Sequence, residues 1–133
     1  MHRILAVLLT AAACRPAPEV EFVATPLSPA EVEAWSAAAI RSAHHEITVR
    51  RTITTGSWCR TLNADAVRTG SEITLRVVAR EAGDDCPPGE GTWGYMAIIR
   101  DLPSGRYDLR VVHTFATPGR PSRLVLRHPV LVE

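Results

Sequence analysis

The stretch from Tyr95 to Phe115 constrains the fold of this chain most strongly. Two runs in which apolar and polar residues alternate are separated by Leu102-Pro103-Ser104-Gly105, a turn-forming sequence. Alternation with a period of two is typical of strands that rest one face on a core, and Pro and Gly between them favour a turn. We therefore expect a β-hairpin. The residues of its second strand that face the core are Tyr107, Leu109, Val111, His113 and Phe115.

Similar alternation recurs along most of the chain. The clearest run holds Ile73, Leu75, Val77 and Ala79 on one face, and the Arg68–Ser71 stretch before it contains a Gly suited to a hairpin turn. From Glu46 another run alternates until Arg51 interrupts its apolar face, which indicates a bulge or a sheet edge there. Near the C-terminus, Pro129 cannot donate a ladder hydrogen bond, so the last strand is expected to be an edge strand or to be broken at Pro129. Six to seven short strands with frequent turns favour an antiparallel sandwich.

The segment from Leu102 to Tyr107 also resembles the corner of immunoglobulin-like and fibronectin type III-like domains, and related turns occur in transthyretin-like modules. The resemblance implies that the Tyr107 hydroxyl bonds back to the backbone of the turn. The remainder of the chain lacks the Cys-Trp-Cys spacing of antibody domains. The expected fold is thus an all-β, immunoglobulin-like antiparallel sandwich of six to seven strands with one short N-terminal helix.

The helix is expected at the start of the domain. Ser28-Pro29-Ala30-Glu31 is a capping-box pattern with Pro at the first helical position. Val32, Trp35 and Ala39 follow at helical spacing, which predicts a helix from Pro29 to about Arg41.

The first residues have the order of a secretory signal peptide: a basic start, an apolar run and small residues before Cys14. This order resembles the lipobox of bacterial lipoproteins, which implies cleavage before Cys14 and a lipid on its thiol. Simple secretion is the alternative. We expect a signal peptide at 1–13, a Pro-rich tether at 14–27 and the domain at 28–133. The Arg that follows Cys14 favours, by the same resemblance, the outer membrane.

The other two cysteines, Cys59 and Cys86, are expected to form a disulfide, because exported compartments are oxidising. A two-thiolate metal site is the alternative. Without Arg3 the mature chain has 14 basic and 14 acidic side chains, so its net charge is 14 − 14 = 0 with His neutral. That balance argues against a nucleic-acid partner.

Candidate chemistry is sparse. His44-His45-Glu46 is the only local group of metal-type ligands, and on a strand His44 and His45 would point to opposite faces. Asp84, Asp85 and Glu90 share a loop but lack calcium-loop spacing. No Ser lies in a Gly-x-Ser-x-Gly motif, and no phosphate-binding loop precedes a helix. We therefore expect no enzyme, no metal and no cofactor.

A recognition patch is expected where strands share a polar face, because apolar surface ringed by Arg is typical of binding sites. The alternative is that the helix or the second sheet covers it. Its residues are Val78, Arg76, Ile98, Arg110 and Val112.

The leading functional hypothesis is a non-catalytic extracytoplasmic lipoprotein module, which is held on the membrane by the lipid on Cys14 and binds an envelope protein or serves a structural role. One alternative is an inhibitor that presents the Gly83–Gly94 loop, stiffened by Pro87-Pro88, to an envelope protease. Another is a periplasmic metal carrier that uses His44 or His45.

Overall fold

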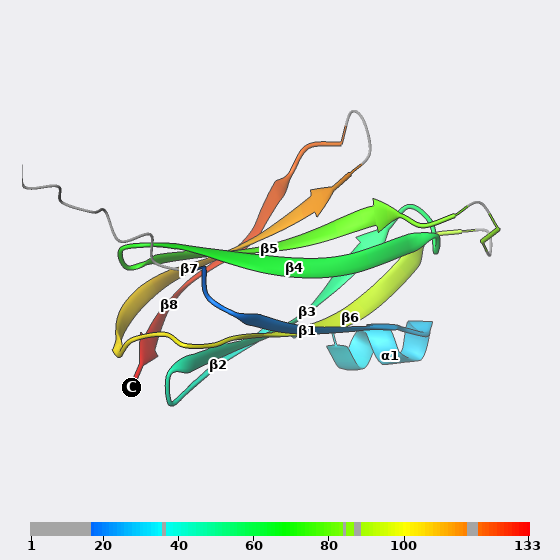
Figure 1. Ribbon diagram of the computed structural model, residues 1–133. Coiled ribbons are helices and arrows are strands. Elements are labelled where there is room, and N and C mark those ends of the chain that lie inside the picture. Colours follow the sequence, from blue (N-terminus) through cyan, green and yellow to red (C-terminus); the bar gives the residue numbers. More distant parts are fainter. Residues whose placement is uncertain (1–16, 36, 84, 87–88, 117–119) are drawn as a thin grey trace, which may run out of the picture.

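The computed structural model describes residues 17–35, 37–83, 85–86, 89–116 and 120–133. In this part of the chain, two four-stranded sheets face each other and one short helix lies beside them (Figure 1). The elements are β1 (Val20–Pro26), α1 (Pro29–Trp35), β2 (Ala39–Ala43), β3 (Glu46–Thr55), β4 (Arg60–Thr69), β5 (Glu72–Glu81), β6 (Gly91–Ile99), β7 (Gly105–Phe115) and β8 (Arg123–Val132).

The first sheet has the order β1-β6-β3-β2, and all its pairs are antiparallel. The second has the order β4-β5-β7-β8, in which β5 and β7 run parallel. The sandwich is therefore all-β as expected, but it is not wholly antiparallel and it has eight described strands rather than six to seven.

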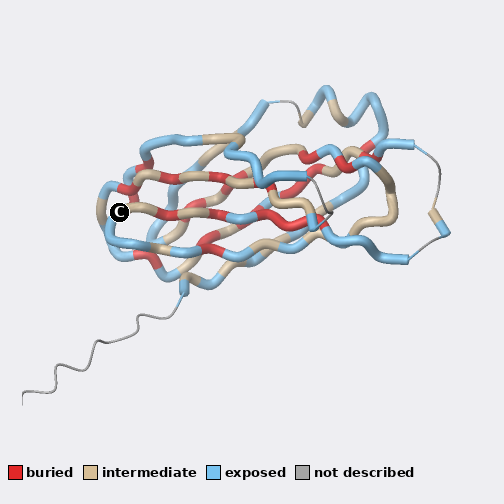
Figure 2. The backbone as a smooth tube through the Cα atoms, turned by 90° about the horizontal axis from the view of Figure 1, so that it is seen from above, coloured by how far each residue is buried: buried red, intermediate tan, exposed pale blue. Residues whose placement is uncertain are grey.

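The core lies between the sheets. Buried positions alternate along the strands, as the red segments of Figure 2 show. The predicted faces of β5 and β7 are confirmed, since Ile73, Leu75, Val77, Leu109 and Val111 are all inaccessible to solvent. Burial of apolar side chains such as these is the dominant favourable term in folding.

The predicted hairpin between β6 and β7 is wrong. Strand β6 pairs with β1 and β3, whereas β7 pairs with β5 and β8, so the turn carries the chain from one sheet to the other. In this turn Asp101 has φ 59° and Leu102 is buried. Because the chain changes sheets here, β6 and β7 each pair with two other strands of their own sheet. Alternation reports a half-buried strand but not the sheet to which it belongs.

The corner itself is confirmed. The Tyr107 hydroxyl donates a hydrogen bond to the Pro103 carbonyl oxygen at 2.5 Å. This bond fixes the start of β7 against the turn that precedes it. Likeness to immunoglobulin domains beyond this corner stays a prediction.

The N-terminal expectations need two corrections. The capping box is present, because the Glu31 amide donates to Ser28 Oγ at 3.3 Å and the Ser28 amide donates to Glu31 Oε1 at 3.1 Å. However, the helix ends at Trp35, and the residues from Ala39 form β2, because Ile40 packs against the core as a strand residue. Part of the expected tether is also structured, since Val20–Pro26 forms β1 and pairs with β6.

The predicted turn at Gly70 is confirmed, and of the two interpretations of the last strand the structure supports the edge. Gly70 in the β4–β5 turn has φ 61°, a conformation that suits Gly. Strand β8 is an edge strand, and its Pro129 lies opposite Asp108, whose amide donates instead to Ser71. Pro129 therefore costs the sheet no hydrogen bond. Among the residues described, no helix has the length and apolar character needed to cross a membrane.

Candidate anion-binding cleft

A cleft opens on one side of the sandwich, between β3 and β8. Strand β2 covers β3 only from Glu46 to Arg50, so the second half of β3 forms the edge of the first sheet. Opposite it, the first residues of β8 form the edge of the second sheet. The cleft has a volume of about 880 Å³, within the range of ligand pockets.

Arg51 points into the interior of this opening. It lies between Val49 and Ile53 in the inward-facing series of β3, and its register with Tyr95 of β6 is regular. Of the two interpretations of Arg51, a bulge or an edge, the structure therefore supports the edge. Within the part of the chain that the structure describes, the Arg51 guanidinium has no ion-pair or hydrogen-bond partner.

Two further arginines flank the same space. Arg123 is the partner of His113 in the β7–β8 ladder, and paired residues share a face, so Arg123 lies on the inward side of the second sheet. Arg120 precedes β8, and its guanidinium carbon lies 3.7 Å from the centroid of the Phe115 ring. Among the described residues no carboxylate forms an ion pair with Arg120.

His113 forms the floor of the cleft. Its Nε2 lies 2.8 Å from the Tyr95 hydroxyl, and the residue is only 5% exposed, so the prediction that His113 faces the core is confirmed. Burial, together with the charges of Arg51 and Arg123, lowers the pKa of His113 to about 4. Burial also raises the pKa of Tyr95, against a smaller opposite effect of Arg51. The pair is therefore neutral at pH 7.

The cleft carries an excess of positive charge. Among the described lining residues, three are arginines and one, Glu90, is acidic, which gives a balance of 3 − 1 = +2. Other arginines are neutralised: Arg76, Arg100 and Arg127 each have a carboxylate partner on the surface. An arginine left unpaired between two sheets retains its full attraction for a carboxylate or phosphate group.

The predicted recognition patch is only partly assembled, because four of its five residues lie on one face of the second sheet. Ile98 belongs to β6 in the first sheet, whereas the other four residues lie in β5 and β7 of the second. Arg76 and Val112 are neighbours in register, but Arg76 forms a two-pronged bond with Asp65 at 2.6 and 3.2 Å.

The two remaining members of the patch are also occupied. Arg110 lies 3.4 Å from Glu72, and Val78 is 6% exposed. The placement of Ile98 was wrong because the prediction assigned β6 and β7 to one sheet.

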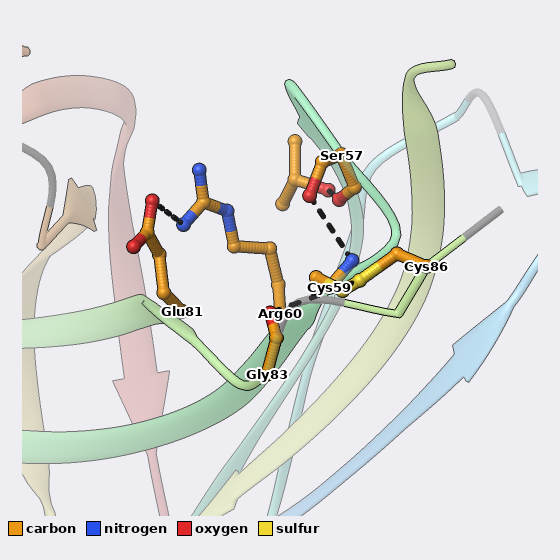
Figure 3. The surroundings of a disulfide bond; sticks show 7 residues. Ser57, Cys59, Arg60, Glu81, Gly83 and Cys86 are labelled. Atoms are coloured by element: carbon orange, nitrogen blue, oxygen red, sulfur yellow. Dashed lines mark hydrogen bonds and ion pairs between the residues drawn. A yellow bond between two sulfur atoms is a disulfide. The ribbon is translucent and has the colours of Figure 1, made fainter. Parts of the chain in front are cut away.

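The cysteine prediction agrees with the structure. Cys59 and Cys86 form a disulfide with their Cα atoms 5.3 Å apart, which joins the start of β4 to the loop between β5 and β6 (Figure 3). The Cys59 amide donates to Ser57 Oγ at 3.1 Å, and the adjacent Arg60 pairs with Glu81 at 3.1 Å. This end of the sandwich is thus held by covalent and ionic contacts between residues that do not themselves line the cleft.

His44 and His45 lie in the turn between β2 and β3, not on a strand. Their ring centroids are 3.9 Å apart, so the expectation that they face opposite ways is wrong. His45 has φ 59°, and its Nδ1 lies 3.0 Å from the Leu102 carbonyl oxygen. The structure brings no group of three or more metal-type side chains together among the residues it describes.

Other predicted residues are only partly placed. Cys14, Asp84 and Pro87-Pro88 lie outside the described residues. The presenting loop expected at Gly83–Gly94 is shorter than predicted, because β6 begins at Gly91.

The sequence did hold a signal for the cleft. Arg51 interrupts an otherwise apolar face, and an inward-facing charge needs a partner. What the sequence could not supply was the opposite wall, because Arg123 and Arg120 lie far along the chain. A scan against protein-family models found no match, and neither a curated protein nor a solved structure matched this chain.

Proposed function

We propose that this chain is an exported, lipid-anchored module without catalytic activity, and that it binds an acidic segment of an envelope partner in the arginine cleft. The observation that carries the binding role is Arg51, which points between the sheets without a counter-ion among the described residues and shares the space with Arg120 and Arg123. The signal-like N-terminus and Cys14 support the location, and the disulfide suits an oxidising compartment.

The energetics favour an anionic partner. A charge that leaves bulk water loses solvation, and an opposite charge with matching hydrogen bonds restores it. Because folding already places Arg51 between apolar neighbours, part of its solvation is lost on folding, and the ligand need not displace that part when it binds. Carboxylates are the anions that a protein partner offers, and arginine binds them through two parallel N–H donors.

The anchor sets where the cleft operates. Because β1 begins at Val20, only residues 14–19 separate the proposed lipid from the folded domain. Six extended residues span at most about 20 Å. The domain would therefore stand close to the membrane, and the cleft would meet partners near the bilayer surface.

The test is binding of a fluorescent acidic peptide to the purified mature domain, followed by anisotropy at two salt concentrations. We expect salt-sensitive binding that is weakened at least about tenfold by Arg51→Gln and by Arg123→Gln. Arg80→Gln is the matched control, because Arg80 is exposed on β5 and does not line the cleft. Equal loss in all three variants, or no binding at all, would refute a specific cleft.

Location is tested separately. Metabolic labelling with a fatty-acid analogue should modify the full-length chain and should fail for Cys14→Ser. Labelling that survives this substitution would refute the proposed anchor.

A further inference from the structure

The free backbone of β3 lies directly beside the arginine cleft. The Arg100 amide donates to the Glu19 carbonyl oxygen at 2.8 Å, and the Leu27 amide donates to the Thr92 carbonyl oxygen at 2.9 Å. The even-numbered residues of β6 therefore bond to β1. The backbone N–H and C=O groups of successive strand residues point alternately to the two neighbouring strands, so odd-numbered residues of β6 such as Tyr95 bond to β3. Their register partners on β3 are Arg51 and Ile53.

It follows that Thr52 and Thr54 direct their N–H and C=O groups away from β6. These groups point toward the side where β2 pairs with β3, but that pairing ends at Arg50, which lies opposite Ala39. Within the described ranges, no turn or loop backbone group bonds to either residue. Two donors and two acceptors are therefore available on a strand edge, where they form a template for another strand.

The other edge at the cleft is protected. Strand β8 has a bulge opposite Val111 and Val112, and Pro129 removes one donor from its outer side. Bulges and prolines are the usual means by which sheets block strand addition. The β3 edge has neither: its ladder with β6 is regular, and Thr52, Ile53 and Thr54 are residues with high strand propensity.

The geometry points to strand addition: an extended acidic peptide pairs with β3 at Thr52 and Thr54 and places carboxylates against Arg51 and Arg123. This inference rests on the proposed function and specifies its ligand. In an added strand every second side chain faces the interior, so acidic residues spaced by two reach the arginines while the intervening ones face solvent.

Charge decides between the possible occupants. A second copy that added through the same edge would contribute the segment from Arg50 to Gly56, which has two arginines and no acidic residue, so it would add positive charge to a cleft that is already positive. An acidic strand from another protein meets the same arginines with complementary charge. A free small anion would use the arginines but not the threonine edge.

The experiment uses an eight-residue peptide of alternating Glu and Val, with the mature domain and isothermal calorimetry. The matched peptide is identical except for N-methyl groups on alternate backbone nitrogens, which remove one edge of donors but keep every carboxylate. On the protein, Thr54→Pro removes the outward amide without loss of a β3–β6 bond, and Thr54→Ala keeps that amide but removes the hydroxyl. Thermal melts of both variants confirm that they fold.

We expect the parent peptide to bind Thr54→Ala at least about tenfold more tightly than Thr54→Pro, because only the backbone amide separates the two variants at the sheet edge. Thr54→Pro and the N-methyl peptide should each weaken binding at least about tenfold. If the N-methyl peptide and Thr54→Pro bind normally while Arg51→Gln still weakens binding, the cleft binds anions and strand addition is wrong. If no acidic peptide binds, the proposed function fails too. If sedimentation shows dimers that Thr54→Pro dissolves, a second copy occupies the edge and the inference is overturned.

Discussion

Acidification should destabilise the domain through His113. The unfolded side chain has a pKa of 6.5, and the folded environment lowers this pKa to about 4 through burial and the charges of Arg51 and Arg123. Between these two values the unfolded chain binds a proton that the folded chain does not. The stabilisation is therefore complete above pH 6.5 and is lost as the pH falls to about 4.

The magnitude follows from the shift. At about 1.36 kcal/mol per pKa unit, lowering the pKa from 6.5 to about 4 corresponds to roughly 3 kcal/mol of unfolding free energy. Because His113 is 5% exposed, solvent screening removes little of this. Urea unfolding between pH 7 and pH 4 measures it, with His113→Gln as the comparison, since Gln can still bond to the Tyr95 hydroxyl. The wild type should lose roughly 3 kcal/mol more than the variant over this range. Parallel pH profiles for the two proteins would refute the reasoning.

Three further perturbations test the packing. Replacing Cys59 and Cys86 by Ser opens a crosslink with a sequence separation of 27 and should cost about 3.5 kcal/mol in urea unfolding; an unchanged midpoint under oxidising conditions would contradict this. Tyr107→Phe removes the hydrogen bond to the Pro103 carbonyl and should lower the unfolding free energy by about 1 kcal/mol. A calorimetric melt measures this, and an unchanged melting temperature would contradict it. Gly94→Ala places a methyl group 2.7 Å from the indole of Trp35, so we expect the free energy of unfolding to fall by about 1–3 kcal/mol and the tryptophan fluorescence to change. If neither changes, the helix does not pack on Gly94.

Local features were predictable because they depend on neighbours in sequence. The capping box at Ser28, the positive φ at Gly70 and the edge position of Pro129 all rest on residue chemistry that acts within a few positions. The bond of Tyr107 was implied by the resemblance of its corner, which is equally local. Strand faces were equally clear, since a buried face requires alternation.

Long-range pairing was not predictable for a physical reason. A strand that alternates can sit in either sheet, so the chain between Ile99 and Gly105 looked like a hairpin turn although it crosses the sandwich. The same ambiguity placed Ile98 beside Val112 and produced the wrong patch. Ala39 fitted both a helical stripe and a strand, and pairing with Arg50 decided in favour of the strand.

The cleft shows the same limit. Arg51 was visible as an exception within an apolar face, but its meaning depends on Arg123 and His113, which reach it only through the fold. The lipid anchor and the extracytoplasmic location stay predictions from the first residues of the chain.

The most direct test of the arginine cleft is a titration of the mature domain with the alternating acidic peptide, followed through the His113 ring signals by nuclear magnetic resonance. His113 forms the floor of the cleft and is sensitive to the charges of Arg51 and Arg123. We predict that the His113 signals shift in a saturable way in the wild type, and that Arg51→Gln needs at least about tenfold more peptide for the same shift. Binding that leaves the His113 signals unchanged in the wild type would place the peptide elsewhere and contradict the account.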